Sequence, residues 1–144
     1  MNTYQAMKKR HQEEVNAFPM AFAFNDKQFA EGMKKLGLNP EDTDKIYSLT
    51  GTGGFYRRTD AINFHAMLDR HHDELQAAID SDLTGEGFIF DMFNYELANH
   101  EYSYTGDISS TLEALNLTED EVNNNKRLRH GLNLAIKAQQ KGGF

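Results

Sequence analysis

The apolar positions of this chain recur with two different spacings. A spacing of three to four residues, typical of amphipathic helices, runs through several segments. Another segment, which begins at Phe88, is apolar nearly all round, as expected for a central buried helix. Two short segments that start with capping residues at Asp107 and Thr118 also have helical character. The longer helices are expected over residues 3–18, 26–36, 60–79, 88–102 and 126–139.

A spacing of two residues predicts strands in another part of the chain. Apolar residues from Phe18 to Phe24 alternate with smaller ones, which indicates a buried or half-buried strand. Further on, two stretches rich in β-formers flank a glycine-rich turn, as in a β-hairpin over residues 46–58. The pattern predicts one α+β domain over residues 1–144. It is mostly helical, and its small antiparallel sheet combines the strand near 18–24 with the hairpin.

Local capping signals support the helix boundaries. Asn25 followed by Gln28 has the spacing of a capping box, and Gly37 is a candidate for a left-handed C-cap. Thr118 and Glu121 have the spacing of a second capping box. Each signal predicts where a helix begins or ends, independently of the apolar spacing.

Composition narrows the class of protein. The chain has 144 residues, no cysteine and a net charge of −7. Without cysteine, no disulfide or thiolate metal site can form. Direct nucleic-acid binding is disfavoured, because contact with phosphates needs clustered basic residues. The start of the chain lacks the apolar run of a secretory signal, and no segment reaches the ~20 apolar residues that cross a bilayer. We therefore expect a cytoplasmic protein that does not bind membranes.

The segment "TGTGGFYRR" allows two interpretations. The backbone amides of Gly51, Gly53 and Gly54, with charge from Arg57 or Arg58, are groups that can bind a phosphate or nucleotide. The segment matches neither the P-loop nor the dinucleotide-binding pattern. Consecutive arginines on a strand also point to opposite faces. A plain hairpin turn is therefore favoured over an anion site.

Residue types that bind metals form a strip on the helix expected over 60–79. His65, Asp69 and His72 are spaced i, i+4 and i+7, which places them along one side of a helix, beside the apolar stripe. Imidazole and carboxylate groups bind zinc, nickel or ferrous iron. The pattern supplies no fourth ligand, so a solvated helix flank is favoured. His71 falls within the apolar stripe and is expected to be a core histidine with a hydrogen-bond partner.

The buried helix carries polar residues that need partners. Glu96 and His100 are one turn apart, and such a pair can form a structural hydrogen bond or perform acid–base catalysis. No nucleophile accompanies them, which favours the structural interpretation. Tyr95, Tyr102 and Tyr104 lie in this helix or just after it. They are candidates for contact with a protein partner, or they close the core and keep a solvated hydroxyl.

Three successive stretches of the chain carry a resemblance to a known family. They read "FPMAFAFNDKQFAEGMKKLGL", "TGTGGFYRRTD" and "GFIFDMFNYELANHEYSYTGD". In this order they resemble a family of small uncharacterised proteins from phages and mobile elements of gut Firmicutes. The resemblance covers most of the chain and implies no activity, cofactor or site residue. It does imply a context, since small acidic proteins on such elements are often inhibitors of host defences, CRISPR systems among them.

These observations lead to one main hypothesis and two alternatives. The main hypothesis is a non-catalytic binding protein without a cofactor. It would be a phage or mobile-element inhibitor that occludes a host defence enzyme or sequesters a small anionic ligand such as a nucleotide. The alternatives are a small metal-dependent enzyme that uses the strip at His65, Asp69 and His72, and a nucleotide-binding protein centred on the glycine loop. The main hypothesis rests on well-capped helices and on the lack of a complete catalytic motif.

Overall fold

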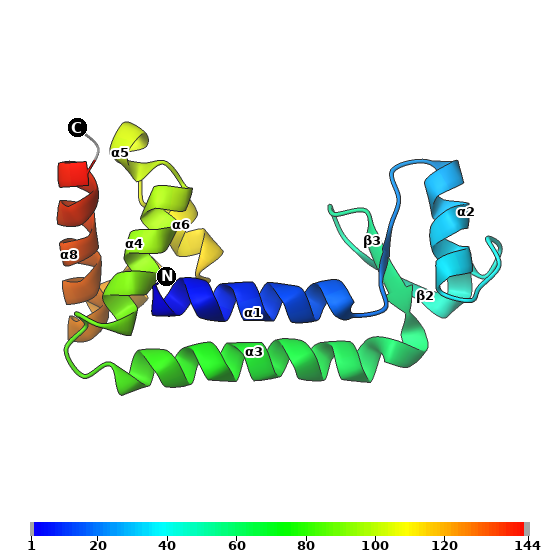
Figure 1. Ribbon diagram of the computed structural model, residues 1–144, viewed down its shortest axis with the longest axis horizontal. Helices are drawn as coiled ribbons and strands as arrows, with labels where there is room; N and C mark the ends of the chain where they lie inside the picture. Colours follow the sequence, from blue (N-terminus) through cyan, green and yellow to red (C-terminus); the bar gives the residue numbers. More distant parts are fainter. Residues whose placement is uncertain (1, 143–144) are drawn as a thin grey trace. The chain divides into compact units, whose positions relative to one another are not determined.

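The computed structural model describes residues 2–142. The chain divides into two compact units, each described here by itself. Unit 1 comprises Met1–Arg10 and Asp73–Phe144, and unit 2 comprises His11–His72. Two helices contribute residues to both units (Figure 1): α1 (Thr3–Ala17) and α3 (Ala61–Ser81).

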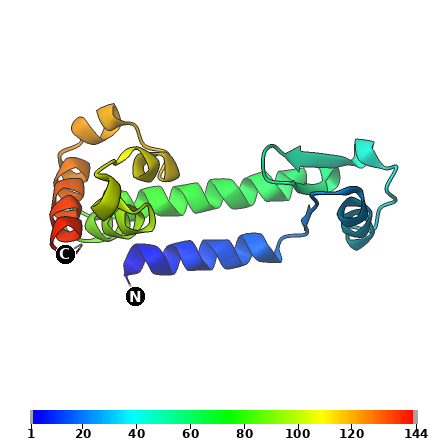
Figure 2. The same cartoon turned by 90° about the horizontal axis from the view of Figure 1, so that it is seen from above.

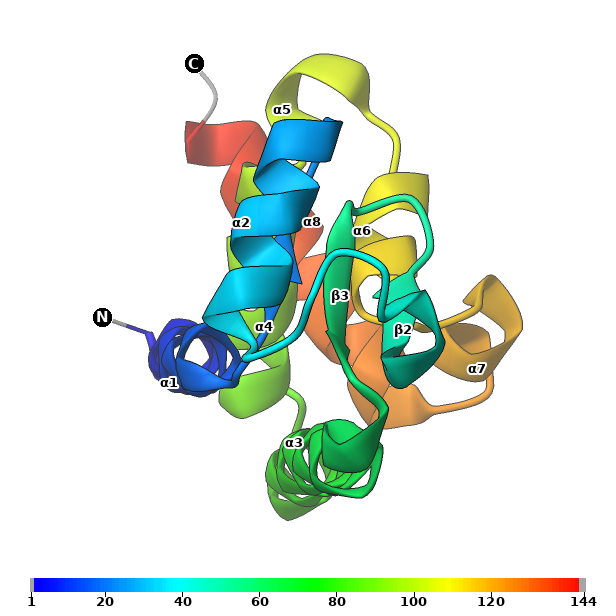
Figure 3. The same cartoon turned by 90° about the vertical axis from the view of Figure 1, so that its right-hand side faces the viewer.

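Unit 2 is built around a three-stranded antiparallel sheet with the strand order β1–β3–β2. β2 (Ile46–Leu49) and β3 (Gly54–Arg57) form the predicted hairpin, and β1 (Ala21–Phe22) pairs with the other side of β3. The helix α2 (Asp26–Lys35) lies alongside the sheet and covers one face (Figures 1 and 3). The core between them consists of Ala21, Met33, Leu36, Ile46 and Phe55.

The opposite face of the sheet packs on the parts of α1 and α3 that belong to unit 2. Phe18 and Phe64 meet edge to face with ring centroids 5.2 Å apart, and Tyr56 stacks on Phe64 at 4.7 Å. This core is completed by Met20 and Met67, which are also buried. Two short 3-10 helices border the hairpin: η1 (Thr43–Lys45) and η2 (Arg58–Asp60).

The described part of unit 1 consists of helices and their connections, with no strand. At its centre, α4 (Phe88–Asn99) packs along α8 (Lys126–Gly142) (Figures 1 and 2). The fully buried apolar side chains of α4 agree with the prediction of a central helix; they are Ile89, Met92, Phe93 and Leu97. Between α4 and α8 the chain forms the short helices α5 (Tyr102–Thr105), α6 (Ser109–Ala114) and α7 (Glu119–Asn123).

Asp82 organises the connection from α3 to α4. Its carboxylate accepts hydrogen bonds from the backbone N–H groups of Thr84, Gly85, Gly87 and Ile89, over distances of 3.0–3.2 Å. Burial alone would raise the pKa of Asp82, but these backbone donors outweigh it and hold the pKa below its usual value. The ionised side chain therefore fixes the turn and satisfies N–H groups at the start of α4.

The predicted fold class is confirmed. The chain is 68% helical and has a small three-stranded antiparallel sheet. Most of the predicted caps are present as well: Asn25 Oδ1 accepts from Gln28 N–H at 2.8 Å, and Gly37 has a φ of +75°. The Gln28 side chain accepts from the Phe24 N–H instead of Asn25, and the N-cap of α6 is Ile108 instead of Asp107. Thr118 and Glu121 form both halves of their capping box. That a single domain spans the chain stays a prediction. Within residues 2–142, every helix is too short or too polar to cross a bilayer.

The strand expected near 18–24 is present but shorter. On one side of this segment α1 continues to Ala17, and on the other side Asn25 caps α2. Only Ala21–Phe22 therefore pair with β3. The expected burial is wrong for the last two aromatic rings of the segment. Phe22 is 57% exposed and Phe24 is 79% exposed.

Candidate functional site

The glycine-rich turn of the hairpin is shaped by its own hydrogen bonds. Gly51 and Gly53 have φ values of +80° and +75°, a region that favours glycine. The Thr52 hydroxyl donates to the Leu49 carbonyl at 2.9 Å and accepts from the Gly54 N–H at 3.0 Å. This side chain therefore closes the turn from within, as in an ordinary hairpin connection.

Two phenylalanine rings from the β1 segment pack against the same glycines. A Cβ atom at Gly53 would lie 2.8 Å from Phe24 Cε1, and one at Gly54 would lie 2.9 Å from Phe22 Cε1. The register places Phe22 opposite Gly54, and the Ala23 N–H donates to the Gly53 carbonyl at 2.9 Å. The glycines thus allow the neighbouring rings to lie on the backbone, an arrangement in which an aromatic side chain covers a glycine of the adjacent strand.

These rings form an exposed apolar surface on unit 2. We call the surface made by Phe22, Phe24, Gly53 and Gly54 the aromatic platform. Beside it lies a hollow of about 360 Å³, whose polar lining residues are Gln28, Glu31 and Lys35 of α2. Exposed aromatic side chains that are held in place before binding are typical of protein interfaces, because they supply contact area at a low cost in conformational entropy.

The two arginines that follow the glycines lie at the other end of β3. At ~3.3 Å per residue, this strand separates them from the turn by about 10 Å. Arg57 Nε donates to Asp60 Oδ2 at 2.8 Å, and Arg58 Nε donates to the Ile46 carbonyl at 3.2 Å. The Arg58 guanidinium also lies 4.6 Å from the centroid of the Tyr47 ring. The structure does not bring the arginines to the turn, so a phosphate site that combines both gains no support.

The strip of His65, Asp69 and His72 lies exposed on α3. Its helical spacing places the three residues along one side of the helix, as expected. Among residues 2–142, no three or more His, Cys, Asp or Glu side chains come together in a way that could hold a metal ion. Metal binding by this strip therefore stays a prediction, and its geometry favours a solvated helix flank.

His71 has a partner, as its position in the apolar stripe predicts. Its Nε2 lies 2.7 Å from Glu14 Oε1, and its ring stacks on His11 with centroids 4.0 Å apart. Arg70 donates to both carboxylate oxygens of Glu14. The hydrogen bonds from Arg70 and then from His71 lower the pKa of Glu14 to about 2. These contacts join α1 to α3 within unit 2.

A buried carboxylate in unit 1 binds residues from the start of α1. Glu96 is 1% exposed, and its Oε2 accepts from the Tyr4 hydroxyl at 2.6 Å and from Lys8 Nζ at 2.9 Å. Thr111 Oγ1 donates to the backbone carbonyl of Glu96 at 3.3 Å. Burial raises the pKa of Tyr4, and its hydrogen bond to Glu96 adds to this effect. We call Tyr4, Lys8, Glu96 and Thr111 the Glu96 network.

The expected hydrogen bond between Glu96 and His100 is not formed. His100 Nε2 lies 3.9 Å from Glu96 Oε1, and this buried nitrogen has no hydrogen-bond partner within the described residues. Tyr4 and Lys8 bind the carboxylate in its place. The arrangement matches a structural network more closely than an acid–base pair.

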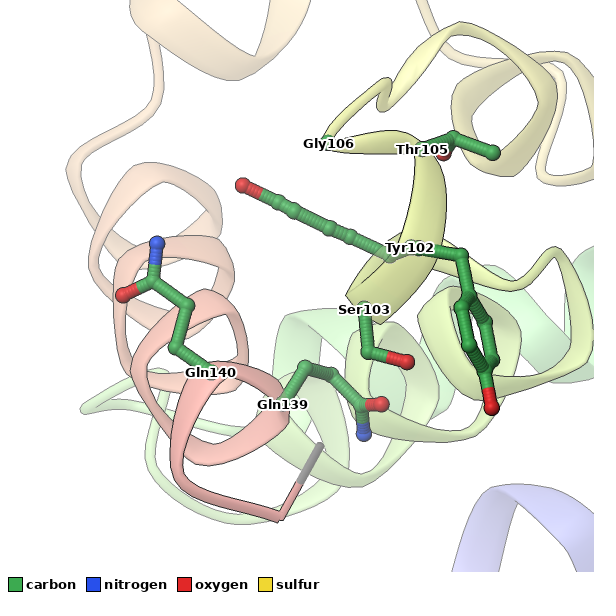
Figure 4. Close-up of a pocket in the computed structure, with 7 residues that line it drawn as sticks. Tyr102, Ser103, Thr105, Gly106, Gln139 and Gln140 are labelled. Atoms are coloured by element: carbon green, nitrogen blue, oxygen red, sulfur yellow. The ribbon is translucent and has the colours of Figure 1, made fainter. Parts of the chain in front are cut away.

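The three candidate interface tyrosines have different environments. Tyr95 is half-buried, with its ring centroid 5.8 Å from that of Tyr4 and 5.3 Å from Lys8 Nζ. Tyr102 packs against the core of unit 1, whereas Tyr104 is 89% exposed. Tyr102 and Tyr104 line a hollow of about 290 Å³ beside α5 (Figure 4). Of the three, Tyr104 has the ring that is most available for contact with another molecule.

A comparison with models of known protein families gives a match over nearly the whole chain. A family model described as a family of unknown function, DUF7659, matches residues 3–138. The chain belongs to DUF7659. No curated protein and no solved structure matches it. The aromatic platform and the Glu96 network both fall within the residues matched by the DUF7659 model.

The sequence of this DUF7659 chain did not predict that Phe22 and Phe24 form a site, and it favoured a structural role for Glu96 without predicting its partners. The alternation of aromatic residues indicated a strand but not which rings stay exposed, because that depends on how far the helices cover the sheet. The partners of Glu96 gave no local signal either, since Tyr4 and Lys8 lie 92 and 88 residues away in sequence. The pair of glycines opposite a row of phenylalanines is the signal that points to the platform, once the strands are paired.

Proposed function

We propose that this DUF7659 chain is a non-catalytic binding protein that contacts a protein partner through the aromatic platform. The observation that carries the proposal is the position of Phe22 and Phe24. Both rings are mostly exposed to solvent, and both are packed against glycine backbone. A single exposed apolar side chain is common on protein surfaces, but adjacent exposed aromatic rings on a defined backbone favour an interface.

The surroundings of the platform suit a protein surface better than a small anion. Gln28, Glu31 and Lys35 line the hollow beside the rings, which gives an apolar centre with a polar rim. The nearest arginines in sequence, Arg57 and Arg58, bind other groups at the far end of β3. The geometry therefore favours occlusion of a partner over sequestration of a small anionic ligand.

We further propose that the protein inhibits a host defence enzyme in the cytoplasm of a bacterial host, on behalf of a phage or mobile element. The support is the resemblance of the chain to small proteins of such elements, together with its acidic charge of −7. An acidic protein is attracted to basic surfaces, such as those with which defence nucleases bind nucleic acid. In this proposal the platform supplies the apolar contact and the net charge speeds the encounter.

The test is affinity capture of the tagged full chain from a host that carries a defence system. The variant Phe22→Ser/Phe24→Ser removes the platform rings. The matched control is Ile62→Ser/Leu83→Ser, which removes two other exposed apolar side chains, 84% and 81% exposed. We expect one protein partner to be captured by the wild type and the control but not by the platform variant. Equal capture by all three chains would reject the platform as the contact surface.

Two further measurements are needed. One shows whether lost capture is due to unfolding, and the other shows whether the captured partner has a role in defence. Thermal unfolding should show that the platform variant is folded, and Phe22→Tyr/Phe24→Tyr should restore capture because it keeps the rings. Plaque formation on the defence-bearing host then tests the biological role. We expect the wild type to restore plaques and the platform variant to fail. Capture without any effect on plaques would reject the defence hypothesis and leave the binding proposal intact.

A further inference from the structure

A second hollow in the molecule belongs to unit 1 and has a different chemistry. It lies between α5 and the last turns of α8 and has a volume of about 290 Å³ (Figure 4). Its lining consists of tyrosine, serine, threonine, glycine and glutamine, and none of the lining side chains is charged. The volume lies just below the range for small-molecule pockets, roughly 300–1,000 Å³. The size suits a ligand of one or two small rings.

One polar group of the hollow is oriented by the protein. The Nε2 atom of Gln139 donates to the Asn94 carbonyl at 3.2 Å and to Asn94 Oδ1 at 2.8 Å. These two bonds hold the amide nitrogen against Asn94 and leave the Oε1 atom of Gln139 as an acceptor. Figure 4 shows Gln139 and Gln140 extending from α8 beside Ser103 of α5. The hollow therefore combines a fixed acceptor with hydroxyl and amide groups.

These groups select a neutral ligand rich in hydroxyl groups. A phosphate, carboxylate or ammonium group would need an opposite charge, which the lining does not supply. Hydroxyl and amide side chains both donate and accept, which matches ligand hydroxyls that do the same. The exposed ring of Tyr104 offers a flat apolar face on which the C–H side of a sugar ring can stack. We infer that this hollow binds a neutral saccharide of one or two sugar units.

A nucleobase is a poorer fit for the same hollow. Proteins that bind bases stack them on aromatic faces, often from more than one side. Here Tyr102 packs against the core of unit 1, so Tyr104 supplies the exposed aromatic ring. The saccharide site uses none of the residues of the aromatic platform and does not depend on the proposed partner protein.

The test is an NMR titration of the ¹⁵N-labelled full chain. The probes are methyl glucoside, N-acetylglucosamine and maltose, with adenosine and inorganic phosphate as probes of other ligand classes. We expect saturable shifts of backbone amides in residues 102–106 and 139–140 with at least one sugar at millimolar concentration. Tyr104→Ala should weaken that binding by about tenfold, because the stacking face is lost. Tyr47→Ala, which removes an exposed ring of unit 2, should leave it unchanged.

Three results would overturn the inference. The first is no saturable shift with any of the sugars. The second is saturable binding of adenosine or phosphate at these residues while the sugars do not bind. The third is sugar binding that is equally strong in the Tyr104→Ala variant, which would place the sugar elsewhere. Tyr104 is exposed, so its substitution should not affect folding, and the spectrum of the variant checks this directly.

Discussion

The ring of Phe24 lies so close to the backbone of Gly53 that a Cβ atom there would come within 2.8 Å of the ring atom Cε1. Phe24 as a whole is nevertheless 79% exposed. The ring therefore lies against the backbone of the turn, although most of its surface remains in water. A side chain that is ordered before binding loses little rotamer entropy when a partner covers it.

The contact between Phe24 and Gly53 predicts an unequal response of the turn glycines to substitution. Gly53→Ala should lower the free energy of unfolding by about 2 kcal/mol, of which about 1 kcal/mol comes from the positive φ and the rest from the contacts of the new Cβ atom with the Phe24 ring and the Ala23 carbonyl oxygen. Gly51→Ala should cost only about 1 kcal/mol, because its φ is similar but nothing lies within 4 Å of its Cβ. Urea denaturation measures both values.

The same substitutions in a Phe24→Ala background provide the control for this prediction. Without the ring, the difference between the two glycine variants should become smaller but not vanish, because the Ala23 carbonyl oxygen still lies 3.0 Å from a Cβ atom at position 53. If Gly51→Ala costs as much as Gly53→Ala in the wild-type background, the ring does not constrain position 53.

The Glu96 network predicts that one tyrosine hydroxyl is important for stability and another is not. Tyr4→Phe leaves the buried carboxylate of Glu96 without its closest donor, at 2.6 Å, and should cost about 2 kcal/mol of unfolding free energy. Tyr104→Phe removes a hydroxyl from an exposed ring and should change stability by less than about 0.5 kcal/mol. Chemical denaturation of both variants tests this, and equal effects would contradict a structural role for the network.

Asp82 predicts a pH-dependent stability. The pKa of Asp82 is lowered in the folded chain. Its contribution to the free energy of unfolding is therefore fully present above the pKa of the unfolded chain, about 4, and is lost as the pH falls through the lower pKa of the folded chain. Asp82→Asn should cost about 1–2 kcal/mol near neutral pH, because the amide accepts the backbone hydrogen bonds less well. The difference from wild type should shrink as denaturation is repeated at lower pH. A penalty that stays constant down to about pH 3 would show that the charge of Asp82 is not involved.

The local sequence signals predicted much of the fold because they act over a few residues. Asn25 with Gln28, Gly37, and Thr118 with Glu121 each determine a helix end through backbone and side-chain groups close in sequence. The hairpin follows from the same kind of local chemistry. These parts of the structure need no information about which elements pack together.

The candidate sites depended on contacts that no local pattern contains. The glycines of the turn are explained by the rings of Phe22 and Phe24, which reach them only because β1 pairs with β3 in one register. Glu96 is explained by Tyr4 and Lys8, from the other end of the chain. The sequence pattern indicates that the glycines and the buried glutamate are unusual. Their contacts, which explain them, are seen only in the packed structure.

Crosslinking tests most directly whether the aromatic platform is the surface that contacts a partner. A photoreactive phenylalanine analogue, p-benzoylphenylalanine, would replace Phe24 in one chain and the similarly exposed Ile62 in another. Each chain would be irradiated inside a defence-bearing host. We expect one discrete crosslinked protein from position 24 and none of it from position 62. Crosslinks of equal strength from both positions, or a partner that is crosslinked from position 62 alone, would contradict this expectation.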